Sequence, residues 1–221
     1  MRFEWKKGKV IPMKQILCFG DSNTYGLIPG TKDRYDWDTR WTGILGKRVQ
    51  AEGYRVIEEG LCGRTTVFDD PLRDGRRGTE LLPVLLETHK PVDTVVLMLG
   101  TNDCKTMYDA SAEVIGKGVE RLLDQIKSGA PDSKVLLISP IELGEGVGEA
   151  GYDPEFGERS VAVSKKLKEV YGRIARERGI HFLPASGYAK PSEQDREHLN
   201  EEGHGRLAEA IYAKFEEVVA G

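Results

Sequence analysis

The sequence predicts an α/β protein in which a parallel sheet is covered by helices on both faces. The first observation is that short apolar runs alternate, along the whole chain, with longer segments whose apolar residues recur at helical spacing. The second is the run Thr94–Leu99, which is apolar after its first residue and contains two adjacent β-branched valines. The third is that no internal repeat or Pro/Ser-rich linker interrupts the sequence, which favours one domain.

The first predicted strand and the first long helix come early in the chain. Gln15–Gly20 is a short buried run that ends at a glycine. Apolar residues then recur at helical spacing across residues 41–49, and Asp38 or Thr39 can cap the start of that helix. Tyr54–Glu58 follows as the second predicted strand.

The middle of the chain continues this alternation. Leu81–Thr88 is predicted as a helix, with Pro83 near its first turn, where proline is least harmful. The strand-like run Thr94–Leu99 comes next, and apolar spacing then predicts a helix across residues 115–126. Lys134–Ser139 is the fourth predicted strand.

The last part of the chain supplies two helices with a short strand between them. Apolar spacing predicts helices across residues 167–174 and 207–218, the second after a cap at Asn200. Ile180–Leu183 is the short fifth strand. Because parallel sheets bind ligands outside the carboxyl ends of their strands, the residues that follow each strand are the candidates for function.

Composition excludes several classes of protein. Hydrophobic residues make up 39% of the 221, which is enough for one full core, so intrinsic disorder is not the main description. The 32 Lys and Arg and 36 Asp and Glu residues give a net charge of -4, so the chain has no overall attraction for nucleic acid. No apolar run approaches the ~18 residues that a membrane-spanning helix needs.

The cysteines and the N-terminus bear on location and domain boundaries. Cys18, Cys62 and Cys104 are odd in number and widely spaced, so neither a disulfide framework nor a zinc-binding cysteine pair is expected. Reduced thiols favour a cytoplasmic protein. Residues 1–13 lack the apolar stretch of a secretory signal and are interpreted as a short extension, which leaves 14–221 as a single domain.

A candidate nucleophile and its base follow the first and last strands. A serine hydroxyl such as that of Ser22 is a weak nucleophile and needs a base, usually a histidine that a carboxylate orients. His198 follows the last strand, and Asp195 stands three residues before it, within reach of its ring in a compact turn. Taken alone, Ser22 also suits a turn or helix cap, and Asp195 and His198 also suit a solvated loop.

Candidate donors for an oxyanion follow three strands. The tetrahedral intermediate of acyl transfer needs hydrogen-bond donors aimed at its oxyanion. The backbone N–H groups of Ser22 and Gly63 and the side-chain amide of Asn102 are the right kinds of group. Gly63 also suits a turn, and Asn102 an Asx-turn. Their coincidence at the ends of strands in one sheet favours acyl transfer.

Four motifs follow one another along the chain: GDSNT at 20–24, the glycine at 63, GTND at 100–103 and DREHL at 195–199. In this order they resemble the sequence blocks of the SGNH (GDSL-like) hydrolase superfamily. Residues 64–71 and 198–204 are similar to its bacterial arylesterase/acyltransferase branch. The resemblance implies a flavodoxin-like, three-layer α/β/α sandwich with about five parallel strands.

The resemblance also implies an activity and roles for the candidate residues. Ser22 would be the nucleophile, Asp195 and His198 would complete the triad, and Ser22, Gly63 and Asn102 would form the oxyanion hole. The implied reaction is hydrolysis of short-chain carboxylic esters, aryl esters in particular, through an acyl-enzyme, with acyl transfer to alcohols or peroxide as a variant. We expect a small-molecule ester substrate, no cofactor or metal, no nucleic-acid or membrane partner, and a homo-oligomer.

Other enzymes and other uses of these residues stay open as alternatives. A carbohydrate O-deacetylase of the same superfamily would use the same triad. Cys62 or Cys104 is a rival nucleophile, since thiolates are intrinsically reactive. Asp21 and Asp103 are expected to hold local backbone rather than a metal.

A rival of another class is a non-catalytic nucleotide- or phosphate-binding α/β domain. Residues 20–24 would then be an anion-binding turn at a helix N-terminus. The sequence lacks both G-x-G-x-x-G and G-x-x-x-x-G-K-[ST], which disfavours this alternative. The acidic, Gly-rich stretch 142–157 suits a lid, a pocket wall or a subunit contact, and it also suits a mobile surface loop.

Overall fold

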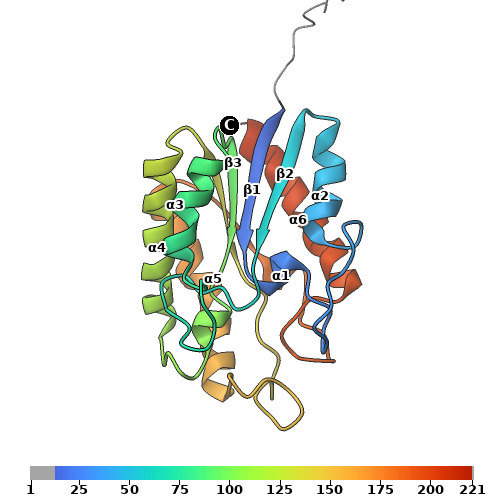
Figure 1. Cartoon of the computed structure of the whole chain (residues 1–221), viewed down its shortest axis with the longest axis vertical. Helices are drawn as coiled ribbons and strands as arrows, with labels where there is room; N and C mark the ends of the chain where they lie inside the picture. Colours follow the sequence, from blue (N-terminus) through green and yellow to red (C-terminus); the bar gives the residue numbers. More distant parts are fainter. Residues whose placement is uncertain (1–12, 221) are drawn as a thin grey trace, which may run out of the picture.

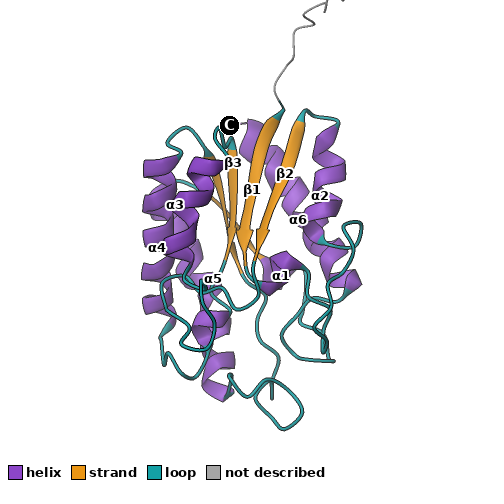
Figure 2. Ribbon diagram, in the orientation of Figure 1, coloured by secondary structure: helices purple, strands orange, loops and turns teal. Residues whose placement is uncertain are grey.

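A five-stranded parallel sheet lies at the centre of the computed structural model, which describes residues 13–220 (Figures 1 and 2). The strand order is β2-β1-β3-β4-β5, and every neighbouring pair is parallel. The strands are β1 (Lys14–Gly20), β2 (Tyr54–Gly60), β3 (Thr94–Met98), β4 (Lys134–Ser139) and β5 (His181–Pro184). The predicted five-stranded α/β sandwich is therefore confirmed.

Helices cover both faces of the sheet and make the two outer layers (Figure 1). One face carries α2 (Trp41–Gln50) and α6 (Glu201–Ala220), and the other carries α3 (Gly78–Thr88), α4 (Ala112–Gly129) and α5 (Glu158–Arg178). Successive strand residues point to opposite faces. Leu17 and Phe19 of β1 accordingly join the core under α3–α5, whereas Ile16 and Cys18 join the core under α2 and α6.

The strand order creates a switch point beside β1. The chain adds β2 on one side of β1 and then returns to add β3, β4 and β5 on the other side. Because crossovers between parallel strands keep one hand, growth in opposite directions places the connecting helices on opposite faces. The loops after β1 and β3 therefore diverge, and the crevice between them is the place where such sheets bind ligands.

Two sequence-based predictions about helix starts are wrong. The N-cap of α2 is Arg40, with no side-chain cap, instead of Asp38 or Thr39. Helix α3 begins at Gly78, so Pro83 lies in its interior rather than near its first turn. Proline cannot donate to the carbonyl of the preceding turn.

A side chain from the neighbouring helix compensates for that proline. Gln125 Nε2 in α4 donates to the carbonyl oxygen of Thr79 at 2.8 Å, which is the acceptor that Pro83 leaves without a backbone donor. The expected cap of the last helix is present, because Asn200 Oδ1 accepts from Gly203 N at 2.8 Å.

The predicted N-terminal extension, residues 1–13, lies outside the described residues except for Met13, which immediately precedes β1. Among residues 13–220, no helix is both long and apolar enough to cross a membrane.

Candidate active site

The short helix α1 (Ser22–Tyr25) follows β1 and lies at the carboxyl edge of the sheet (Figure 1). Ser22 is its first residue. Only glycine fits at Gly20, because a Cβ there would overlap the Thr24 hydroxyl and crowd the Met98 carbonyl. Asp21 caps α1 by accepting from Asn23 N at 3.0 Å. Ser22 itself is only 3% exposed.

Three predicted side chains form one chain of hydrogen bonds. Ser22 Oγ lies 2.9 Å from His198 Nε2, and His198 Nδ1 lies 2.8 Å from Asp195 Oδ2. The Asp195 carboxylate also accepts from the backbone N–H of His198 at 2.9 Å, so one residue both closes the turn and orients the ring. Ser22 and His198, 176 positions apart in the chain, thus meet, and with Asp195 they have the arrangement of a nucleophile, a base and an orienting carboxylate.

Asn23 attaches the histidine loop to the serine turn, a role that sequence reasoning missed. Asn23 Oδ1 accepts from Leu199 N at 2.9 Å, and Asn23 Nδ2 donates to the Glu197 carbonyl oxygen at 3.4 Å. These bonds hold the backbone on both sides of His198. The only available signal was an asparagine next to Ser22, a residue type that often bonds to backbone groups.

The three predicted oxyanion donors differ in whether they already donate a hydrogen bond within the protein. Within residues 13–220, the backbone N–H groups of Ser22 and Gly63 donate to no protein acceptor. Gly63 adopts a left-handed φ of 81°, which favours glycine. Asn102 starts the short 3-10 helix η1 (Asn102–Cys104), and its amide donates to the Arg64 carbonyl at 3.1 Å. An amide nitrogen carries two hydrogens, so one remains for an oxyanion.

Acidic neighbours set the electrostatics of His198. Burial lowers the pKa of the His198 ring, but the nearby Glu197 and the hydrogen bond to Asp195 raise it further, so its pKa lies above the ordinary value. Burial also raises the pKa of Asp195, yet its hydrogen bonds with His198 outweigh burial and bring the pKa below the usual range. Asp195 therefore stays ionised and favours the imidazolium form.

Glu197 is a second carboxyl beside the same ring nitrogen. Its Oε1 atom lies 3.6 Å from His198 Nε2, and its side chain is 7% exposed. Burial raises the pKa of Glu197, His198 lowers it, and the neighbouring Asp153, Asp195 and Asp21 raise it again, so that it lies at about 7. Sequence reasoning assigned no role to this residue.

The cysteines and aspartates around the site do not form a competing centre. Burial raises the pKa of the Cys62 thiol to about 11 and that of Cys104 well above its ordinary value, so neither forms a reactive thiolate readily. Asp103 accepts from Thr66 N at 3.0 Å, across two loops. Among the described residues, no cluster of three or more His, Cys, Asp or Glu could hold a metal ion.

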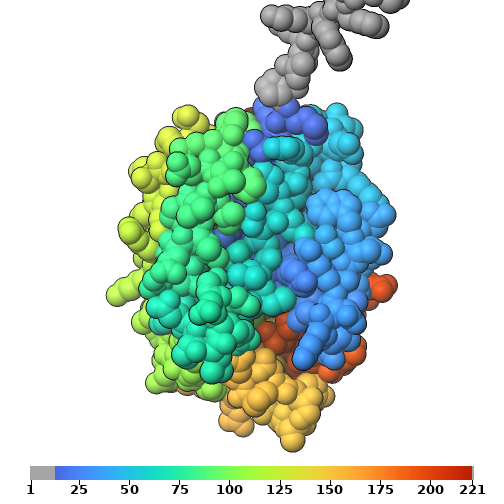
Figure 3. Space-filling view, in the orientation of Figure 1, coloured from blue at the N-terminus to red at the C-terminus, as the bar shows by residue number. Residues whose placement is uncertain are grey.

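The acidic, Gly-rich loop 142–157 lies against the turn that carries the histidine. Gly144 N donates to the Arg196 carbonyl at 2.7 Å, and the Arg196 guanidinium pairs with Glu149 at 2.8 Å and stacks over Tyr152. Arg196 adopts a φ of 61°, which is unusual for a residue with a Cβ. The loop projects from the end of the molecule at which the strands terminate (Figures 1 and 3).

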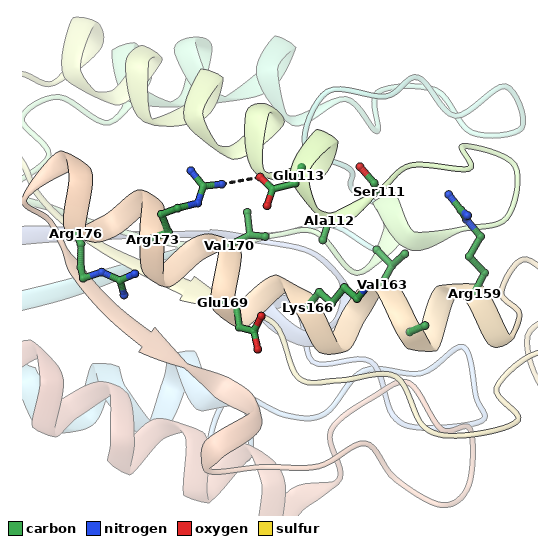
Figure 4. Close-up of a pocket in the computed structure, with 11 residues that line it drawn as sticks. Ser111, Ala112, Glu113, Arg159, Val163, Lys166, Glu169, Val170, Arg173 and Arg176 are labelled. Carbon is green, nitrogen blue, oxygen red and sulfur yellow. Dashed lines mark hydrogen bonds and ion pairs between the residues drawn. The ribbon is translucent and has the colours of Figure 1, made fainter.

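A separate groove of about 620 Å³ runs between α4 and α5 (Figure 4). Charged side chains line it, and Arg173 in α5 pairs with Glu113 in α4 across it at 2.6 Å. Neither Ser22 nor His198 lines this groove, so it takes no part in the arrangement described above.

Comparisons with known proteins agree on a family and a fold. Residues 18–206 match the model of the GDSL-like lipase/acylhydrolase family. The chain is 34% identical to Est24, a carbohydrate acetylesterase from Sinorhizobium meliloti, with a TM-score of 0.85 over 92% of this chain and 99% of the other. It is 32% identical to the aryl esterase from M. smegmatis, with a TM-score of 0.85 over 93% and 99% of the two chains.

A third solved structure is similar to the same degree. The chain is 34% identical to a putative arylesterase from Agrobacterium tumefaciens, with a TM-score of 0.83 over 93% of this chain and 100% of the other. A search of curated proteins found no match. The similar structures thus include both aryl esterases and a carbohydrate acetylesterase.

Proposed function

Because this chain belongs to the GDSL-like lipase/acylhydrolase family, we propose that it hydrolyses short-chain carboxylic esters, aryl esters among them, through an acyl-enzyme on Ser22. The observation that carries the proposal is the hydrogen-bonded sequence from Ser22 Oγ through His198 to Asp195. The similarity to the M. smegmatis aryl esterase and the Agrobacterium putative arylesterase supports aryl esters as substrates.

In the first half of the reaction, His198 Nε2 takes the hydroxyl proton as Ser22 Oγ attacks the ester carbonyl carbon. Asp195 holds the imidazolium in place through Nδ1. The backbone N–H groups of Ser22 and Gly63, with the Asn102 amide, stabilise the negative oxygen of the tetrahedral intermediate. His198 then returns the proton to the departing alcohol, and the C–O bond to that alcohol breaks.

In the second half, an acceptor replaces the departed alcohol. His198 takes a proton from water, water attacks the acyl-enzyme, and the carboxylic acid leaves as Ser22 recovers its proton. An alcohol or peroxide in place of water gives a new ester or a peracid. Every step moves a proton or an acyl group between groups already named, so we propose a mechanism without a cofactor or metal.

Further features of the protein are part of the same proposal. We propose a homo-oligomer in which loops such as 142–157 shape the acyl pocket, and a small-molecule substrate with no nucleic-acid or membrane partner. Three free cysteines, Cys18, Cys62 and Cys104, support a cytoplasmic location. The family match gives no support to the alternative of a non-catalytic nucleotide-binding domain.

The proposal is tested by the hydrolysis of p-nitrophenyl acetate and butyrate. The wild type should turn over both esters, and Ser22→Ala should lose turnover while its circular dichroism spectrum is unchanged. Cys62→Ser serves as the matched control and should keep its activity. Equal turnover by wild type and folded Ser22→Ala would remove Ser22 from the nucleophile's role.

A further inference from the structure

Glu197 places an unused carboxyl group at the reacting atoms. Its Oε1 atom is 3.6 Å from His198 Nε2, the nitrogen that hydrogen-bonds to Ser22 Oγ. Glu197 is buried, although a glutamate is among the residues least often found inside a protein without a partner. None of the proton or acyl transfers proposed for Ser22 and His198 involves this carboxyl.

The carboxyl of Glu197 lacks a donor of its own. Across residues 13–220, no side chain or backbone group donates a hydrogen bond to it, and its one charged partner is the His198 ring. The other charged groups that act on it are the carboxylates Asp153, Asp195 and Asp21. The Glu197 side chain keeps 7% of its surface exposed, so a molecule that enters the site can reach its carboxyl. A hydrogen-bond donor on the substrate would supply the partner that residues 13–220 do not.

The position of Glu197 indicates which part of the substrate carries that donor. His198 Nε2 must return its proton to the ester oxygen of the departing alcohol, so this oxygen lies next to Nε2 in the reacting complex. Oε1 of Glu197 is 3.6 Å from the same nitrogen. A hydroxyl on the carbon next to the esterified carbon lies within a similar distance of the ester oxygen and can therefore reach Oε1.

We propose that Glu197 is a specificity-determining residue that accepts a hydrogen bond from a hydroxyl group adjacent to the ester oxygen. The preferred substrates would then be short-chain acyl esters of vicinal diols and polyols rather than simple alkyl or aryl esters. This inference rests on the proposed function, because it assumes that Ser22 forms an acyl-enzyme and that His198 protonates the leaving alcohol.

The same contact has a consequence for acyl transfer. By microscopic reversibility, the acceptor that attacks the acyl-enzyme occupies the position of the departing alcohol. A diol in that position would donate to Glu197 with one hydroxyl while its other hydroxyl loses a proton to His198. Diols should therefore be better acceptors than simple alcohols of the same length.

The test compares two esters that differ in one donor. 2-Hydroxyethyl acetate has the hydroxyl, and 2-methoxyethyl acetate keeps the oxygen but cannot donate. At a pH above the raised pKa of Glu197, where its carboxyl is ionised, wild-type kcat/KM should favour the hydroxyethyl ester by about 10- to 100-fold, the range for a hydrogen bond to a charged group. Glu197→Met should bring the ratio close to one, and Glu197→Gln, which keeps an acceptor, should give an intermediate ratio. Glu193→Gln, at an exposed position in the same loop, is the matched control and should keep the wild-type ratio.

Three results would overturn the inference. A wild-type ratio close to one would show that the hydroxyl is not recognised. A ratio that is unchanged in both Glu197 variants would assign the preference to another residue. Equal losses on both esters would show that Glu197 acts on His198 rather than on substrate.

An error in the role of Glu197 and an error in the role of Ser22 would give different results. Ser22→Ala with p-nitrophenyl acetate tests the nucleophile without reference to Glu197, because the nitrophenyl group has no adjacent hydroxyl. If that activity depends on Ser22 while the ester ratio ignores Glu197, only the specificity is wrong. Circular dichroism of each variant checks folding, and Glu197→Gln, which is nearly isosteric, provides the test should Glu197→Met not fold.

Discussion

Replacing Asn23 by alanine should separate the histidine loop from the serine turn. The substitution removes the acceptor for Leu199 N and the donor to the Glu197 carbonyl, which lie at 2.9 Å and 3.4 Å. Both contacts flank His198 in the chain. The side chain of Asn23 bonds to backbone groups and not to Ser22 Oγ or the His198 ring, so we assign it as a positioning residue.

The structure gives the size of the expected effect. Leu199 is fully buried, so its N–H is left without a partner, at a cost of about 1–3 kcal/mol. The longer bond to the Glu197 carbonyl adds about 0.5 kcal/mol. We therefore expect the free energy of unfolding to fall by about 2–3 kcal/mol. If His198 moves by about 1 Å from Ser22, kcat should fall by about 100-fold.

Urea denaturation and p-nitrophenyl acetate kinetics measure the two effects on one sample. The matched control is Asn200→Ala, which removes the α6 cap at Gly203 N and should cost about 1 kcal/mol with kcat unchanged. Asn23→Ala with wild-type kcat and a stability loss no larger than that of the control would refute the reasoning.

Four further predictions concern the oxyanion, the base, its orienting carboxylate and the strained turn. Asn102→Ala should lower kcat by about 10²–10³ with KM little changed, whereas an unchanged kcat in a folded variant would exclude that role. Because the pKa of His198 lies above its ordinary value and the reaction needs the neutral ring, kcat/KM should rise with pH above the usual histidine range. Asp195→Asn should lower kcat by about 10⁴, and near-wild-type turnover would argue against its orienting role. The free energy of unfolding should be about 1 kcal/mol higher for Arg196→Gly than for Arg196→Ala, because glycine adopts a φ of 61° without strain. Equal free energies of unfolding in urea titrations would contradict this.

The sequence could predict the strands and the place of the site because both depend on short-range patterns. Each strand is a local apolar run, and the carboxyl ends of parallel strands meet at one edge, so residues that follow them must be neighbours. That argument brings Ser22, Asn102 and His198 together without any knowledge of side-chain positions. The motifs then supplied the assignment of roles by resemblance.

The features that the sequence did not predict depend on contacts between residues far apart in the chain or in different elements. Asn23 bonds to groups 174 and 176 residues away, so its positioning role was not visible. The start of α3 was misplaced because Gln125, in another helix, compensates for Pro83. A glutamate in a loop is usually exposed to solvent, so the sequence did not indicate that Glu197 is buried beside His198.

Covalent labelling with a fluorophosphonate tests the central claim most directly. The reagent forms a stable bond to an activated serine and can be located by mass spectrometry of peptides. We predict one label per chain, on Ser22, that is lost in His198→Ala although the serine is still present. Labelling of another residue, or of Ser22 to the same extent without His198, would contradict a serine nucleophile activated by that histidine.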